Sequence, residues 1–238
     1  MPSYESIAQF YDAVNGEPVE LCAQILGLLE SHSPSASSVL ELGCGTGLVL
    51  AGLGSGFALT GVDLSKEMLD IARRRCPSVT LVEGDFTSLD LVSTFDVVLS
   101  VFDTMNHLTS REKWRAAISV AAKHLVPSGL FIFDVNTIER LRSLSEVDPW
   151  AYDFDGHTLV MSVESTSDNH AIWYLKVFEP QINGTYRCHE EAIEELALSL
   201  SEVRELLSQH FEVLEVLDTN GATATEESER AIFVARRR

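Results

Sequence analysis

A short glycine-rich segment, VLELGCGTG at residues 39–47, constrains the fold more than any other feature of the sequence. The segment begins as an apolar strand at 39–42, and glycines at 43, 45 and 47 then lead into a helix expected near Thr46. Because glycine has no Cβ, the backbone here can approach a ligand closely, and the first N–H groups of the helix can donate hydrogen bonds to it. A strand, a glycine-rich turn and a helix in this order predict the first unit of a ligand-binding α/β fold.

Strands and helices alternate through the rest of the first half of the chain, as in a parallel sheet. Helix is expected over roughly the first thirty residues, and Ser65 is expected to cap a helix that runs to Arg75. The segment 109–112 matches a capping box for a further helix, which PSG at 127–129 would end. The remaining predictions for this half are strands at 39–42, 58–63, 79–83, 95–101 and 130–134.

The rhythm changes after Asn136, where extended segments replace the alternation. Segments at 158–164, 171–178 and 185–198, separated by turn sequences at 167–169 and 183–184, predict a hairpin meander. The third of these could equally be a short helix, because its glutamates favour helix and its alternation is poor. Ser199 and Glu202 then form a second capping box, and two strands at 212–217 and 230–235 follow.

Asp63 indicates what the glycine-rich turn binds. It lies twenty residues after Gly43, at the end of the second predicted strand, where a carboxylate can accept both hydroxyl protons of a ribose. A dinucleotide fingerprint would have Gly or Ala three residues after its second glycine, but this position is Leu48. The glycines instead alternate, and with Glu41 they complete an E-x-G-x-G-x-G pattern.

This pattern resembles motif I of the class I S-adenosylmethionine-dependent methyltransferases. The segments GVDLSKEMLDIAR at 61–73, EGDF at 83–86, FDVVLSVFDTMNHL and LVPSGLFIFDVNT are similar to the later motifs of the same family. The meander after Asp134 and the N-terminal helices resemble the insertion and lid of its small-molecule members. Those relatives usually carry Gly-Gly where this chain has Ser128-Gly129.

The resemblance implies an α/β fold, a Rossmann-like three-layer sandwich with a seven-stranded mixed sheet, an N-terminal helical lid and a small antiparallel β insert. It implies three regions: the lid and S-adenosylmethionine-binding core at 1–137, a β insertion that roofs the substrate at 138–198, and a C-terminal helix and strands at 199–238 that complete the core sheet.

The resemblance also implies cofactor contacts for residues that match the motifs. Gly43, Cys44 and Gly45 would contact the methionine part through their backbone, close to Glu41. Asp63 would bind the ribose. Leu64 and Met68 would pack on the adenine, Asp85 would accept from its amino group, and Phe86 would offer its backbone N–H. The Ser100 carbonyl would accept from the cofactor's ammonium group, and Tyr11 would cover the site.

The acceptor side is less defined. Methyl transfer from a sulfonium is an in-line displacement that needs alignment and a dry site, and it needs a base only when the acceptor arrives protonated. His107 follows the fourth predicted strand and is the candidate base; the alternative is a loop histidine bonded to nearby backbone.

Asp103 and Asn106 are candidates to orient the substrate, and Asp134 is interpreted as a structural cap. Residues of the insert, His157, His189 and Glu190, either face the acceptor or lie on a solvated face.

Charge and cysteines limit the partners. With 17 Lys and Arg against 36 Asp and Glu, the net charge of the 238-residue chain is −19, a field that repels phosphates and anionic membranes. We therefore expect no nucleic acid, no membrane and a small neutral or amine acceptor; a homodimer stays open. Scattered cysteines without a metal pattern and an N-terminus unlike a signal peptide favour a cytoplasmic protein without a metal site.

Two other functions compete with a methyltransferase that produces S-adenosylhomocysteine. One is a nicotinamide-dependent oxidoreductase on a similar sheet, against which Leu48 argues. The other is a noncatalytic module that keeps the S-adenosylmethionine pocket but has lost the acceptor chemistry.

Overall fold

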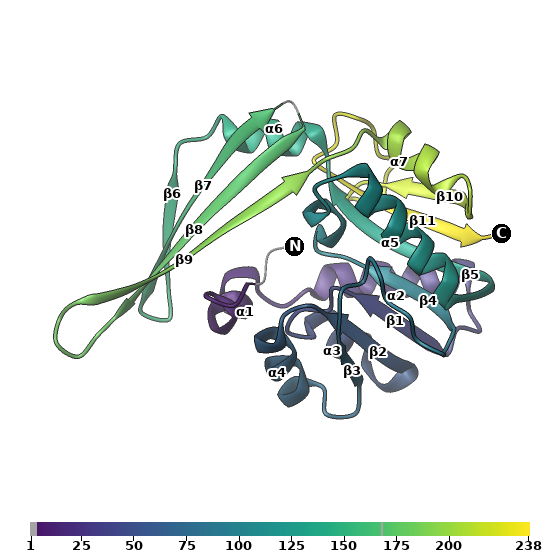
Figure 1. The fold of residues 1–238 in the computed structure, drawn as a ribbon, viewed down its shortest axis with the longest axis horizontal. Helices are drawn as coiled ribbons and strands as arrows, with labels where there is room; N and C mark the ends of the chain where they lie inside the picture. The colour runs from purple at the N-terminus through teal and green to yellow at the C-terminus, as the bar shows by residue number, and fades with distance from the viewer. Residues whose placement is uncertain (1–3, 168) are drawn as a thin grey trace.

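The computed structural model describes residues 4–167 and 169–238 and contains two sheets (Figure 1). The first sheet has seven strands in the order β10-β11-β5-β4-β1-β2-β3. β11 pairs antiparallel with β5 and β10, and the pairs among β1 to β5 are parallel. The predicted seven-stranded mixed sheet is confirmed. Its strands are β1 (Ser38–Leu42), β2 (Ala58–Asp63), β3 (Thr80–Glu83), β4 (Phe95–Ser100), β5 (Leu125–Asn136), β10 (Phe211–Leu217) and β11 (Arg230–Arg237).

Helices cover both faces of this sheet and bury its apolar side chains. On one face, Leu40 and Leu42 of β1 share a core with α5 (Arg111–His124) and α7 (Leu200–Leu207). On the other face, Val39 packs with α2 (Val19–His32) and α3 (Leu48–Leu53). Side chains alternate between the faces of a strand, so two apolar cores form and the sheet becomes the middle layer. Short elements complete this region: η1 (Ala8–Phe10), α1 (Tyr11–Asn15), η2 (Gly54–Gly56), α4 (Lys66–Arg75) and η3 (Thr104–His107).

Two of the three predicted helix caps are confirmed. The Ser65 side chain accepts a hydrogen bond from the Met68 N–H at the start of α4, and Ser199 and Glu202 form the reciprocal capping box of α7. The cap of α5 is Ser110, whose hydroxyl accepts from the Lys113 N–H, so the capping box predicted from Thr109 is wrong by one residue.

The expected end of α5 also needs correction. The helix ends at His124, and residues 127–129 lie inside β5, which is longer than predicted. A Cβ on Gly129 would lie 2.9 Å from the Asp96 carbonyl oxygen, so this glycine permits a close approach of β5 to β4. The turn-forming residues therefore shape the start of a strand, not a separate loop.

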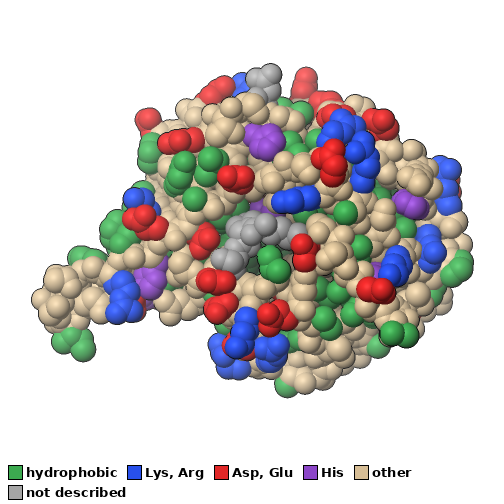
Figure 2. Space-filling model, viewed as in Figure 1, with side chains coloured by type: hydrophobic (Ala, Val, Ile, Leu, Met, Phe, Trp, Pro, Cys, Tyr) green, Lys and Arg blue, Asp and Glu red, His purple; other side chains and the backbone are tan. Residues whose placement is uncertain are grey.

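The second sheet is antiparallel and projects from the core as an arm (Figures 1 and 2). It contains β6 (Trp150–Phe154), β7 (His157–Ser167), β8 (His170–Pro180) and β9 (Tyr186–Leu196). The sequence predicted three of these strands and missed β6 and the preceding helix α6 (Ile138–Ser145). The segment left open between helix and strand is β9, paired with β8 along its whole length. The turn expected at 167–169 includes Asp168, which lies outside the described residues.

η1 and α1 lie between the arm and the core, whereas α2 covers one face of the first sheet (Figure 1). Ile7 and Phe10 pack against Leu159, Leu175 and other apolar residues of the arm. In α2, Cys22, Ile25, Leu28 and Leu29 are buried, whereas Val19 and Leu26 are exposed. Among the described residues, no helix has the length and apolar character needed to span a bilayer.

Replacing Ser199 with Ala removes the hydroxyl that accepts from the Glu202 N–H at 3.2 Å. We expect the free energy of unfolding to fall by about 1 kcal/mol in urea titrations followed by circular dichroism. The control is Ser145→Ala, since that hydroxyl only donates to the Arg142 carbonyl of its own helix, and its effect should stay under about 0.5 kcal/mol. Equal effects of the two variants would contradict a stabilising cap.

Candidate active site

The glycine-rich turn after β1 is held by the carboxylate of Asp63 at the end of β2. One carboxylate oxygen accepts from the Gly45 N–H at 2.8 Å, and the other accepts from the Ser65 N–H at 2.8 Å. Gly43 and Gly45 have φ of 74° and 52°, a conformation that favours glycine. A Cβ on Gly43 would lie 2.4 Å from the Thr104 methyl carbon, whereas a Cβ on Gly45 would meet nothing within 4 Å. The backbone at Gly45 therefore faces open space.

This space is a cavity, here called the glycine-side cavity, to which many of the predicted residues contribute. Its lining includes the predicted residues Tyr11, Gly43, Gly45, Asp63, Leu64, Met68, Phe86 and His107. The sequence reasoning missed Tyr4, Phe102 and Thr104, which also line it. A smaller hollow adjoins it at the glycine turn and is lined in part by Glu41, Cys44, Val101 and Phe102.

Glu41 brings an unusual carboxyl group to this hollow. The residue is 2% exposed, and its Oε2 has no hydrogen-bond partner among the described residues. Burial, with a smaller effect from the Asp63 charge, raises the pKa of Glu41 well above its usual range. A cationic group in the hollow would offset this cost and favour the ionised carboxylate.

Two predicted residues do not line either space. Asp85 is exposed, and its Oδ1 accepts from the backbone N–H and the hydroxyl of Thr87, both at 2.7 Å. Ser100 is fully buried in β4, and its hydroxyl donates to the Leu42 carbonyl. Val101 and Phe102, the next residues along the chain, line the hollow instead.

Residues 4–15, here called the N-terminal segment, cover the glycine-side cavity and are held there by side-chain contacts. The Thr46 hydroxyl donates to Asp12 at 2.6 Å, and Arg75 forms an ion pair with the same carboxylate. Tyr4 reaches His107, with its hydroxyl 2.9 Å from Nε2. Burial, Tyr11 and nearby carboxylates raise the pKa of Tyr4, so its phenol stays protonated within hydrogen-bond distance of the imidazole.

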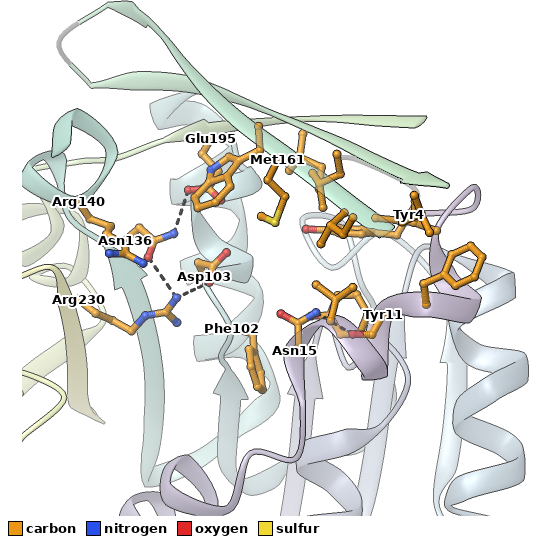
Figure 3. A pocket seen from close by; sticks show the side chains of 18 residues that line it. Tyr4, Tyr11, Asn15, Phe102, Asp103, Asn136, Arg140, Met161, Glu195 and Arg230 are labelled. Atoms are coloured by element: carbon orange, nitrogen blue, oxygen red, sulfur yellow. Dashed lines mark hydrogen bonds and ion pairs between the residues drawn. The ribbon is translucent and has the colours of Figure 1, made fainter. Parts of the chain in front are cut away.

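A second cavity, the sheet-side cavity, lies between the N-terminal segment, the arm and the ends of β4, β5 and β11 (Figure 3). It shares Tyr4, Tyr11 and Phe102 with the glycine-side cavity. The arm supplies an apolar wall of Leu159, Met161, Trp173, Leu175, Val177 and Ile193. The opposite end is polar and is formed by Asp103, Asn136, Arg140, Glu195 and Arg230.

Arg230 of β11 organises this polar end. Its guanidinium contacts Asp134 and Asp103, each at 2.6 Å, and donates to the Asn136 side-chain oxygen at 3.1 Å. Burial works against the ionised form of Asp103, but Arg230 and His107 outweigh it and lower the pKa of Asp103. Asp134 is more than the structural cap expected from the sequence, because it also joins this cluster. No local sequence signal identifies Arg230 as its partner.

Phe102 and Asp103 connect the two cavities through an unusual backbone. Both have left-handed conformations, with φ of 59° and 50°, which are strained for residues other than glycine. The Asp103 N–H donates to Asp134 at 2.7 Å and helps to hold this turn. As a result, Phe102 faces both cavities directly after β4.

Glu195 of β9 was also missed by the sequence reasoning. It is 2% exposed, and its Oε2 accepts from the Asn136 side-chain amide at 3.0 Å. Burial, and then the charge of Asp103, raise the pKa of Glu195 to about 8. Glu195 lines the same cavity as Ile193, two residues earlier in β9, but the poor alternation of this segment gave no signal for that face in the sequence.

Apart from Asp103, the residues that the sequence offered for the acceptor side do not line the sheet-side cavity. His107 lines the glycine-side cavity, and burial lowers its pKa despite the opposing charge of Asp103. Asn106 is buried and donates to the Asn136 and Leu196 carbonyls, so it ties β5 to β9. His157, His189 and Glu190 line neither cavity. Among the described residues, no group of three or more His, Cys, Asp or Glu is arranged to hold a metal ion.

Comparison with known proteins relates this geometry to one family. A family model described as a methyltransferase domain matches residues 39–129. The cypemycin N-terminal methyltransferase of a Streptomyces species is 31% identical over 93% of this chain and 90% of its own length. A dTDP-3-amino-3,6-dideoxy-alpha-D-glucopyranose N,N-dimethyltransferase of Streptomyces fradiae is 35% identical, but the match spans only 54% of this chain and 52% of that protein.

Solved structures agree on the fold. A S-adenosylmethionine-dependent methyltransferase from Clostridium acetobutylicum superposes with a TM-score of 0.87 and 22% identity over 98% of each chain. The glycine turn, the strand order and these relatives lead to one assignment: the chain belongs to the class I methyltransferases, enzymes that use S-adenosylmethionine as their methyl donor.

Proposed function

We propose that this enzyme transfers a methyl group to an oxygen or nitrogen of a small molecule bound in the sheet-side cavity. The observation that carries this proposal is that the two cavities share Tyr4, Tyr11 and Phe102, so ligands in both would meet at these side chains. The amino-sugar dimethyltransferase among the relatives supports a small-molecule acceptor. Membership of the methyltransferase family leaves the nicotinamide alternative without support.

The residues of the glycine-side cavity fit the cofactor. The open space at Gly45 leaves room for a ligand against the backbone, and the unpartnered Glu41 carboxyl oxygen suits a cationic group. We assign ribose binding to Asp63, adenine packing to Leu64, Met68 and Phe86, and the cover of the site to Tyr11. Asp85 and Ser100 are left out of this set because neither lines the cavity. S-adenosylmethionine supplies an electrophilic methyl group on a positively charged sulfur.

The Tyr4–His107 pair is proposed to take up the proton of the acceptor. His107 faces only the glycine-side cavity, whereas Tyr4 lines both cavities, so the imidazole reaches the acceptor through the phenol. The Tyr4 hydroxyl would receive the acceptor's proton while it gives its own to Nε2 of His107. The lowered pKa of His107 keeps the imidazole neutral, and able to accept, at neutral pH.

We also propose the functional division of the chain expected from the sequence. Residues 1–137 would form the lid and the cofactor-binding core, residues 138–198 the roof of the acceptor site, and residues 199–238 the remainder of the core sheet. The apolar wall from the arm supports the roof assignment. A cytoplasmic location is inferred from the free cysteines Cys22, Cys44, Cys76 and Cys188.

Asp63→Ala tests the cofactor site. Loss of charge-assisted hydrogen bonds should weaken binding of S-adenosylhomocysteine, measured by calorimetry, by about 1 to 3 kcal/mol. Asp70→Ala is the control, because Asp70 is an exposed residue of α4 that pairs with Arg73 and lines neither cavity. Unchanged affinity in the Asp63 variant would remove this residue from the site, and absence of binding to the unaltered protein would overturn the proposed function.

His107→Gln tests the proton acceptor. With an acceptor found by screening for S-adenosylhomocysteine production, kcat at pH 7.5 should fall by about 100-fold while cofactor affinity is retained. Because the pKa of His107 lies below its usual 6.5, kcat of the unaltered enzyme, which reports the substrate-bound complex, should decline only at pH below about 6.5. His210→Gln, a substitution outside both cavities, should keep the original rate and profile. An unchanged acidic limb in the His107 variant would rule out the proposed role.

A further inference from the structure

The polar end of the sheet-side cavity carries an excess of negative charge. Arg230 lies between two carboxylates, Asp103 and Asp134, so one net negative charge remains after the guanidinium is neutralised. Glu195 adds a further carboxyl group on the arm side of the same end. Figure 3 shows Asp103 and Glu195 reaching this end from opposite elements, with Asn136 between Glu195 and Arg230.

Neither arginine that lines the cavity has an unpaired guanidinium. Arg230 is bound as just described, and Arg140 pairs with Glu229 at 2.9 Å. No lysine is among the described residues that line the cavity. A phosphate group in the cavity would find no lysine and would compete with Glu229 for Arg140, at an end where Asp103 and Asp134 already outnumber Arg230, and this repulsion disfavours a dianion.

The groove next to the sheet-side cavity is also acidic. A groove between the start of α2 and the β10–β11 loop shares Asn15, Phe102, Asp103 and Arg230 with the cavity. Its other charged residues are Glu17, Glu20 and Asp134, all of them acidic. An acceptor that extended from the cavity into this groove would meet carboxylates there as well, so a pyrophosphate tail is disfavoured in both places.

The rest of the cavity suits an apolar ligand body. Leu159, Leu175 and Val177 of the arm face it from one side, and Phe10 and Val14 of the N-terminal segment face it from another. Trp173 adds the face of its indole ring, with Nε1 directed toward the Glu195 carboxyl group. The cavity thus combines an apolar wall with one acidic end.

We propose that the methyl acceptor is a phosphate-free amine with an apolar body, held as its ammonium against the adjoining carboxyl groups of Asp103 and Glu195. This inference rests on the proposed function, and it separates the chain from its relative that acts on a dTDP-sugar. Tyr4 lines the same cavity, so the bound nitrogen lies within the group of side chains that includes the proposed proton acceptor.

The protonation state of Glu195 gives the inference a second readout. With a pKa of about 8, Glu195 is largely protonated at pH 7 in the free protein. An ammonium ion beside it favours the carboxylate and lowers this pKa, so amine binding near pH 7 should release a proton. A neutral ligand in the same cavity would release none.

The first experiment uses the full chain saturated with S-adenosylhomocysteine and isothermal calorimetry at pH 7. The probes are phenylalkylamines with two to four methylene groups, the matching phenylalkyl alcohols, and dTDP-3-amino-3,6-dideoxyglucose. At least one amine should bind about tenfold more tightly than its alcohol, with proton release seen by comparing buffers of different ionisation enthalpy, and the dTDP-sugar should not compete with it. Tighter binding of the dTDP-sugar, or equal binding of amines and alcohols, would overturn the inference.

The second experiment compares Glu195→Gln with Glu194→Gln. Glu194 is the exposed neighbour on the other face of β9, so it is a matched control for charge and position. The Glu195 variant should bind the amine about tenfold more weakly and lose the proton release, while its affinity for the alcohol and for S-adenosylhomocysteine stays the same. Retained amine affinity would overturn the inference.

Binding of S-adenosylhomocysteine to the unaltered protein distinguishes a failure of the proposed function from a failure of the inference about the acceptor. If the unaltered protein does not bind S-adenosylhomocysteine, the proposed function fails. If it binds S-adenosylhomocysteine but shows no preference for amines, only the inference about the acceptor fails. The comparison of probes on the unaltered protein needs no variant, so it remains decisive even if Glu195→Gln does not fold.

Discussion

The ion cluster around Arg230 is the interaction on which the rest of the site depends. One guanidinium joins β11 to Asp134 of β5 and to Asp103 in the turn after β4. Removing one partner from such a cluster leaves a poorly solvated charge, which is strongly destabilising. The cluster also orients Asn136, which in turn contacts Glu195 on the arm. The strained turn, the polar end of the cavity and the base of the arm are therefore set by the same contacts.

The core and the projecting arm contribute different kinds of side chain to the two cavities. The core places the glycine turn, Asp63 and the cluster at one edge of the parallel strands, where their carboxyl ends meet. The arm contributes mostly apolar side chains, and the N-terminal segment fills the space between the two parts. The residues that the two cavities share, Tyr4, Tyr11 and Phe102, come from outside the arm, but Tyr4 packs against the arm's apolar cluster, so the arm also supports the boundary between the cavities.

The features predicted from the sequence are those determined by local interactions. The glycine turn, Asp63 and the caps at Ser65 and Ser199 each depend on a few neighbouring residues, and the structure has all of them. Arg230, Glu195 and Asn106 could not be assigned in this way, because their partners lie 30 to 127 residues away in the sequence. β6 was missed although Trp150, Tyr152 and Phe154 alternate with Ala151 and Asp153, because a strand of five mostly exposed residues is too short to stand out from the loop around it.

The position of β11 between β5 and β10 has a consequence for how the protein is made. Ribosomes deliver the chain from its N-terminus, so the nascent polypeptide contains Asp103, Asp134 and Glu195 well before Arg230. Until β11 inserts, the carboxylates of Asp103 and Asp134 lack their cation, and their like charges oppose closure of this end of the sheet. Delivery of one late strand therefore completes both the sheet and the electrostatic balance of the sheet-side cavity.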